Sequence, residues 1–454
     1  MSNALQKLNI DDKTMPTFEP LLSDIWGSLY KMRPELKEDT ELPDELKTNH
    51  SFMQRIMADE KFDNYREYTK LDELSSVLAT TKFGEKTKEW LEEQRQANEE
   101  LNDQLNELQA LQRQLEKQEK ENGTSQVNEQ LKKDLQQARE NFNDQVNQQV
   151  QQNGENLSQK FFQAFQDTKE TKNSVKQLVS GSTAGSGDME LRKVPLKDQL
   201  QLAEKITKQT HMKEIAEWAG RLKQIAKLKQ KSVHRNNVER SGVSLGNDIE
   251  KLMPAELALY SHKSTRIDFL RRFTEGQTLE FETRAKESLG KGPIILCLDQ
   301  SGSMQRMDTQ SKGFAIALMS IAKKQKRDFC YIPFSSEYKV YRFLKGKISV
   351  QEMMKLSEEF LDGGTNFLMP LQECLSIIEE SRFKKADIVF VTDGEARLQH
   401  SFINDFQNKK IEKEFSVLSL LIGGGNTNTL EKFSDRVITI NDLDEEGSYK
   451  AFEI

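Results

Sequence analysis

Oxygen-bearing side chains gather at the ends of two apolar segments of the chain. The first apolar run, 294–298, leads into a D-x-S-x-S pattern, and the second, 387–391, leads into Thr392-Asp393-Gly394. Between them, Gly363-Gly364 gives the backbone freedom to aim a threonine hydroxyl. The five candidate ligands are Asp299, Ser301, Ser303, Thr365 and Asp393. Carboxylates and hydroxyls without sulfur or imidazole suit a hard cation, so we predict a Mg²⁺ site, with Mn²⁺ or Ca²⁺ as alternatives.

The elements that must position these ligands alternate between strand and helix. The predicted strands are 294–298, 329–334, 339–344 at an edge, 387–391, 416–422 and 437–440, and the predicted helices are 308–326, 349–360, a helix opened by the Gly363–Asn366 turn, and 429–433. This alternation predicts an α/β fold with a doubly wound, mostly parallel sheet. Such sheets bind ligands outside the carboxyl ends of their strands, where Asp299 and Asp393 are expected.

A simpler interpretation is that the two serines cap the next helix and that Asp393 forms a turn. It leaves the concentration of polar oxygens at strand ends unexplained, and we favour the metal site.

Three segments in this order resemble the metal-ion-dependent adhesion site of von Willebrand factor A domains, over about residues 293–441. They are the D-x-S-x-S pattern, the Gly363–Asn366 turn and the strand end with Asp393. The resemblance implies that Asp299, Ser301 and Ser303 are the first-loop ligands, Thr365 the second-loop ligand and Asp393 the third-loop ligand. It also implies a Rossmann-like fold and a site that binds a partner's acidic residue without performing chemistry.

A second resemblance narrows the expected function. GNDIEKLMPAEL (246–257), followed by a helix and PIILCLDQSGSM (293–304), is similar to the ViaA-like family of cytoplasmic bacterial proteins. In that family a helical region precedes a von Willebrand factor A domain, and the proteins work with MoxR-type AAA+ ATPases. The resemblance implies a non-enzymatic, chaperone-like adaptor that binds the ATPase, its client protein or both through an acidic residue.

Composition predicts how the rest of the chain is organised. Of 454 residues, 31% are charged and 35% hydrophobic, so much of the chain lies outside a packed core. Apolar side chains at helical spacing predict an all-α region before the sheet. The expected domains are a helical domain at 1–85, a polar helical hairpin or coiled coil at 86–180, a flexible linker at 181–188, a helical connector at 189–290 and the α/β domain at 291–454. Either an intramolecular hairpin or a homodimeric coiled coil would fit 86–180.

Cysteine usage and hydropathy suggest where the protein works. Cys297, Cys330 and Cys374 lie in apolar patterns without CxxC spacing, which is typical of buried thiols in a reducing compartment. The amino-terminal residues lack an apolar signal segment, and no run approaches a membrane span. We expect a cytoplasmic protein.

Two other classes of function are weighed against the adaptor. A Mg²⁺-dependent phosphoester hydrolase could use the two aspartates, but there is no GxxxxGK[ST] or HExxH motif and only Arg397 is a nearby cation. A scaffold could instead contact membrane or nucleic acid through the helix at 211–235. The basic residues of that helix are Lys223, Lys227, Lys229, Lys231 and Arg235. The net charge of −7 does not favour nucleic acid as the main partner.

Overall fold

The computed structural model describes residues 15, 17–38, 42–43, 46–122, 129–179, 186–236, 238–249, 252–285, 292–380, 382–441, 443 and 452. The chain divides into two compact units. Unit 1 is Met1–Val179 with Leu191–Lys213, and unit 2 is Ser180–Glu190 with Glu214–Ile454. The expected connector, 189–290, is therefore shared between the units.

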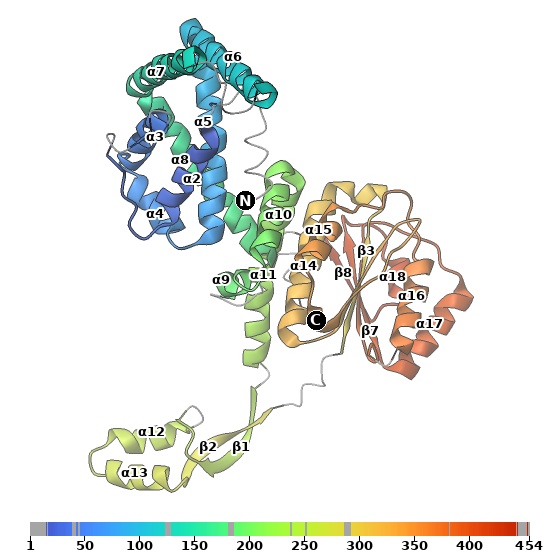
Figure 1. The fold of residues 1–454 in the computed structure, drawn as a ribbon. Helices are drawn as coiled ribbons and strands as arrows, with labels where there is room; N and C mark the ends of the chain where they lie inside the picture. Colours follow the sequence, from blue (N-terminus) through green and yellow to red (C-terminus); the bar gives the residue numbers. More distant parts are fainter. Residues whose placement is uncertain are drawn as a thin grey trace. The chain divides into compact units, whose positions relative to one another are not determined.

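Unit 1 is helical and has a core rich in aromatic side chains. Its helices are α2 (Phe18–Tyr30), α3 (Lys47–Met57), α4 (Phe62–Thr69), α5 (Glu73–Ala97), α6 (Glu99–Asn122), α7 (Glu129–Gln152), α8 (Gly154–Val179) and α10 (Leu196–Lys208) (Figure 1). The long helices α5 and α8 pack along each other, with the rings of Phe83 and Phe161 stacked 5.0 Å apart. Asp72 caps α5 by accepting a hydrogen bond from the Ser75 amide at 2.7 Å.

The two polar helices α6 and α7 pack against each other within one chain. Leu101, Leu105 and Leu108 of α6 are buried, as is the stripe of α7 that includes Leu135 and Phe142. Within one chain this packing corresponds to the hairpin alternative, and the residues between the two helices, 123–128, lie outside the described residues. Most of the expected linker, 181–185, also lies outside them, and Ser186 already begins helix α9 (Ser186–Leu191).

One expectation for the region before the sheet is wrong. The region is mostly helical, but β1 (Val238–Gly246) and β2 (Thr278–Ala285) form an antiparallel hairpin around α12 (Pro254–Ser261) and α13 (Arg266–Thr274). Within the expected helical connector, helix α13 ends at Thr274. Beyond it, apolar and acidic residues alternate along β2 with the period of a strand, and pairing with β1 supplies the cross-strand contacts.

The main sheet of unit 2 confirms the predicted fold class. Its strands are β3 (Ile294–Asp299), β4 (Phe329–Phe334), β5 (Tyr341–Phe343), β6 (Asp387–Thr392), β7 (Ser416–Ile422) and β8 (Arg436–Ile440). They lie in the order β5-β4-β3-β6-β7-β8, and every pair is parallel except β4 with β5.

Helices cover both faces of this sheet (Figure 1). On one face lie α14 (Asp308–Gln325) and α15 (Val350–Glu358), and on the other α16 (Leu368–Glu379), α17 (His400–Lys413) and α18 (Asn428–Glu431). Strand β3 is buried on both sides, so its alternate residues enter two separate cores. Leu296 packs with α14, whereas Cys297 packs with α16.

A helix that precedes the sheet in sequence belongs to the same core. In α11 (Thr210–Asn236), Leu222, Ile225 and Ala226 pack with α14. The close approach requires a glycine, because a Cβ on Gly313 of α14 would lie 2.6 Å from the Cβ of Trp218. The α/β unit is thus larger than the domain expected from the strand pattern.

No helix within the described ranges is long and apolar enough to cross a membrane.

Candidate functional site

The two predicted aspartates meet at the carboxyl edge of the sheet. Asp299 is the last residue of β3, and Asp393 directly follows β6, which is the parallel neighbour of β3. The Ser303 hydroxyl donates to Oδ1 of Asp393 at 2.9 Å and lies 3.1 Å from the Ser301 hydroxyl. The first and third loops are therefore joined through oxygen atoms of the predicted ligands themselves.

Asp299 is fully buried at this edge. Its Oδ1 accepts the backbone N–H of Ser301 at 2.9 Å, and its Oδ2 accepts the hydroxyl of Thr392 at 2.5 Å. Burial raises the pKa of the Asp299 carboxyl above its usual value, hydrogen bonds from Thr392 and Ser301 oppose this rise, and the charge of Asp393 adds to it. A bound cation would offset both the lost hydration and the repulsion between the carboxylates.

The second loop, which contains Gly363 and Thr365, lies against both the first and the third loop. Gly302 donates its backbone N–H to the Gly363 carbonyl at 3.0 Å, which ties the second loop to the first. On the other side, a Cβ on Gly394 would lie 3.7 Å from the Thr365 hydroxyl oxygen, so the second loop also approaches the third. Gly363 has φ +91, a conformation that favours glycine. All five predicted ligands thus belong to three loops that contact one another.

The capping interpretation of the serines is wrong. The residues after Ser301 form a short 3-10 helix, η5 (Gly302–Met307), and the Ser301 side chain makes no capping hydrogen bond to it. Helix α14 begins later, after Met307. The Ser301 and Ser303 hydroxyls face each other and Asp393, not the helix amides that a cap would bond.

Three supporting residues escaped the sequence reasoning. Thr392 orients the Asp299 carboxylate, and Ser336 accepts the Gly364 amide at 2.9 Å. Asp362, next to the Gly-Gly pair, lies with its Oδ1 3.0 Å from where a Cβ of Gly302 would be. A signal was available for Thr392 and Ser336, since both are polar residues at or just beyond the carboxyl end of a buried strand.

A buried polar network lies behind the first loop. Lys312 bonds Oδ2 of Asp308 at 2.7 Å and the Ser357 carbonyl at 3.1 Å, so it joins the start of α14 to the end of α15. Gln300, between the first two ligands, is 2% exposed and donates to the Tyr331 hydroxyl at 3.3 Å. These bonds hold the backbone of the first loop against the sheet.

The ligand chemistry fits a hard cation. Two carboxylates and three hydroxyls form a set of oxygens with room for water, as Mg²⁺ prefers. Across the described ranges, no three His, Cys, Asp or Glu side chains converge as a metal cluster, so a cation at this point would depend on hydroxyl oxygens as well. Arg397 lies on the third loop but its side chain is exposed.

Helix α11, which contains the predicted basic residues, does not expose all of them to solvent. Lys223 is only 4% exposed, so it cannot contact a membrane or nucleic acid. Lys227 is half-buried, and the side chains of Lys229, Lys231 and Arg235 lie outside the described residues.

All three cysteines are free and buried, in agreement with their expected role as small hydrophobes. The sulfur atoms of Cys297 and Cys374 lie 3.3 Å apart, and burial raises the pKa of the Cys374 thiol well above its usual value. The Cys374 thiol is therefore a protonated core group.

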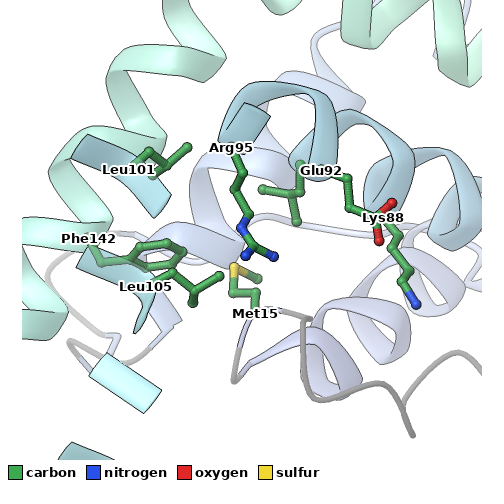
Figure 2. A pocket seen from close by; sticks show the side chains of 8 residues that line it. Met15, Lys88, Glu92, Arg95, Leu101, Leu105 and Phe142 are labelled. Carbon is green, nitrogen blue, oxygen red and sulfur yellow. The ribbon is translucent and has the colours of Figure 1, made fainter. Parts of the chain in front are cut away.

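A pocket between helices of unit 1 is too small for an organic ligand (Figure 2). It holds a volume of about 10 Å³, roughly one water molecule. In Figure 2 the side chain of Arg95 points toward Met15, and Leu105 and Phe142 also line the pocket.

Comparison with known proteins agrees with this geometry. The family model "von Willebrand factor type A domain" matches residues 294–395, which span β3 to the third loop. Two proteins of Methanocaldococcus jannaschii, the uncharacterized proteins MJ0811 and MJ0077, are 32% and 30% identical to the chain over 293 and 278 residues. The matches cover 63% and 61% of this chain and 67% and 70% of those proteins.

A bacterial relative extends the similarity. "Regulatory protein ViaA" of Proteus mirabilis is 27% identical over 239 residues, covering 46% of this chain and 49% of that protein. The relatives, the family model and the observed sheet agree. The chain belongs to the ViaA-like family of proteins with a von Willebrand factor type A domain.

Proposed function

We propose that this protein is a metal-dependent protein-interaction adaptor without catalytic activity of its own. In this proposal Asp299, Ser301, Ser303, Thr365 and Asp393 hold Mg²⁺, with Mn²⁺ or Ca²⁺ as substitutes. Such a small ion keeps part of its water shell, and one of those positions accepts a carboxylate from a partner protein.

The observation that carries the proposal is the contact between the first and third loops. The Ser303 hydroxyl bonds Asp393 at 2.9 Å while Asp299 lies buried on the adjacent strand. Two carboxylates in so small a space repel each other, and a divalent cation between them relieves that repulsion. Within the described residues, the hydrogen bonds of the candidate ligands connect only hydroxyls, carboxylates and backbone groups. Such groups are better suited to binding a cation than to acid–base catalysis.

The proposed partner is a MoxR-type AAA+ ATPase, its client, or both. The family resemblance supports this choice, and the printed name of the ViaA relatives, "Regulatory protein", is compatible with a binding role. We further propose that the protein acts in the cytoplasm, where its three buried thiols would stay reduced.

The test measures binding of the purified protein to a MoxR-type ATPase from the same organism, with Mg²⁺ or with excess EDTA. We expect binding in Mg²⁺ that is lost in EDTA and in the Asp299→Ala and Ser301→Ala variants. Asp405→Ala is the matched control, because Asp405 is an exposed carboxylate on α17 and lies outside the three loops. Equal binding with and without EDTA would refute the metal-dependent proposal.

A parallel titration separates the ion from the partner. Calorimetry with MgCl₂ alone should show binding to the wild type and to Asp405→Ala but none to Asp299→Ala. Mg²⁺-dependent turnover of p-nitrophenyl phosphate that is lost in Asp393→Ala would instead favour the hydrolase.

A further inference from the structure

The segment 238–285 exposes apolar side chains at unusual density. We call this segment the arm; it comprises β1, α12, α13 and β2. Of the fourteen large hydrophobic side chains that are exposed among the described residues, eight lie on it. They are Val243, Leu245, Ile249, Leu257, Tyr260, Ile267, Leu270 and Leu279. Apolar side chains gathered in this way on one small element mark an interaction surface.

One face of the β1–β2 hairpin is apolar and exposed. Val243 lies opposite Phe281 and Leu245 opposite Leu279, and cross-strand partners point to the same side of the sheet. Val243, Leu245 and Leu279 are 54%, 64% and 37% exposed. On the opposite face, Thr278 and Glu280 are buried. The hairpin therefore has one covered face and one uncovered apolar face.

The hairpin also has one open edge. The outer edge of β2 is occupied, because Leu279 receives the Met253 amide at its carbonyl, 3.0 Å away, and gives its own N–H to Glu256 at 3.1 Å. Strand β1 pairs only with β2 among the strands that the structure describes. Its outer edge consequently presents backbone donors and acceptors beside the apolar face, an arrangement to which a further strand can add.

Several charged side chains of the arm form ion pairs with one another, one with a buried carboxylate and the others at exposed positions. Glu256, which is 1% exposed, forms a bidentate ion pair with Arg272 and so ties α12 to α13. The Arg272 Nη2 and Nη1 atoms lie 2.7 and 3.2 Å from the two carboxylate oxygens. Arg271 pairs with Asp268 and Glu275 at 3.0 and 3.3 Å. Helix α12 then exposes only uncharged residues, since Glu256 is its single charge. The surface of α12 and the uncovered face of the hairpin, formed by Val243, Leu245 and Leu279, therefore complement an uncharged apolar partner.

We propose that the arm binds an extended, uncharged, apolar polypeptide segment, which adds as a strand to the open edge of β1 and lays alternate side chains beside Val243 and Leu245. This site is separate from the metal site and has the opposite preference, since the metal site is proposed to take an acidic residue. The protein would thus hold two chemically different partners at once.

The test uses the full chain in EDTA, so that the metal site cannot contribute. The probe is a short fluorescein-labelled peptide of alternating valine and threonine, and binding is read by fluorescence anisotropy. A peptide with glutamate in place of threonine is the charge control. We expect the wild type to bind the first peptide and to bind the glutamate peptide more weakly.

Variants locate the site. Val243→Asp/Leu245→Asp and, independently, Leu279→Asp should each weaken binding at least about tenfold, because they place a carboxylate on the face that must be desolvated. Ile411→Asp, at a 76% exposed position on α17, is the matched control and should bind like the wild type. All four substitutions are at exposed positions, and circular dichroism checks that each variant is folded.

Three results would overturn the proposal. The first is peptide binding that the three arm substitutions leave unchanged, and the second is no binding by the wild type. The third is a wild-type dimer in light scattering that Val243→Asp/Leu245→Asp dissociates, because the face would then be occupied by a second copy of the chain. Since the assay contains EDTA, none of these results bears on the Mg²⁺-dependent adaptor.

Discussion

The buried lysine of α11 allows a quantitative prediction. Lys223 is 4% exposed and lies near Lys323 of α14 and Glu190 of α9. Burial lowers the pKa of Lys223 from 10.5 to about 7; repulsion from Lys323 acts in the same direction, and attraction to Glu190 opposes it. The side chain therefore destabilises the fold while it is protonated.

The sign follows from proton binding in the two states. Between the folded pKa of about 7 and the ordinary value of 10.5, the unfolded chain holds the Lys223 proton and the folded chain releases it. Because the unfolded state binds more protons in this window, the free energy of unfolding rises with pH. From about pH 6 to about pH 9, these pKa values correspond to a gain of roughly 2 to 3 kcal/mol.

Lys223→Met removes the charge and keeps a long, flexible apolar chain. We expect the variant to be more stable than the wild type near pH 6 and the difference to shrink toward pH 9. Urea unfolding followed by circular dichroism at several pH values measures it. Lys227→Met, at a half-buried position one helical turn away, is the control and should keep the wild-type pH dependence. Parallel pH curves for wild type and Lys223→Met would refute the reasoning.

Two further substitutions test the packing of each unit. Gly313→Ala should lower stability by about 1 to 3 kcal/mol, because the new methyl group would lie 2.6 Å from the Trp218 Cβ; an unchanged melting temperature would show that α11 does not rest on α14. Phe161→Ala should cost about 3 to 5 kcal/mol, since its ring is 1% exposed and stacks on Phe83, whereas the neighbouring Phe162→Ala, at a 38% exposed position, should cost far less in the same thermal melt.

Much of the α/β unit could be predicted from sequence because local signals and tertiary structure agree there. Continuous apolar runs mark β3, β4 and β7, and a sheet buried on both faces needs such runs. Four of the five candidate ligands lie at or just beyond the ends of β3 and β6, which the pattern marks clearly, whereas Thr365 follows the Gly363-Gly364 pair. The order of the strands then brings Asp299 and Asp393 to adjacent positions, although 94 residues separate them in the sequence.

The parts that escaped prediction depend on contacts that no local pattern records. The residues of β2 alone do not predict a strand, because Leu279 and Phe281 supply only a short alternation. The strand becomes evident only from its pairing with β1. The packing of α11 on α14 depends on the missing side chain of Gly313, which looks like any helical glycine in sequence. The basic residues around Lys223 in sequence predict an exposed contact surface for membrane or nucleic acid, whereas its neighbours in space bury it.

The pairing of β3 with β6 has a consequence for folding. The Thr392 hydroxyl reaches the Asp299 carboxylate across 93 residues, and the parallel ladder between the two strands is equally non-local. Contacts of such sequence separation form slowly, because a long loop must close before any of them is made. During synthesis the proposed cation site cannot be completed before β6 has left the ribosome. If Mg²⁺ binds there as proposed, its acquisition would report that β3 and β6 have paired, so that a partner selecting the loaded site would also select chains whose central strands are in place.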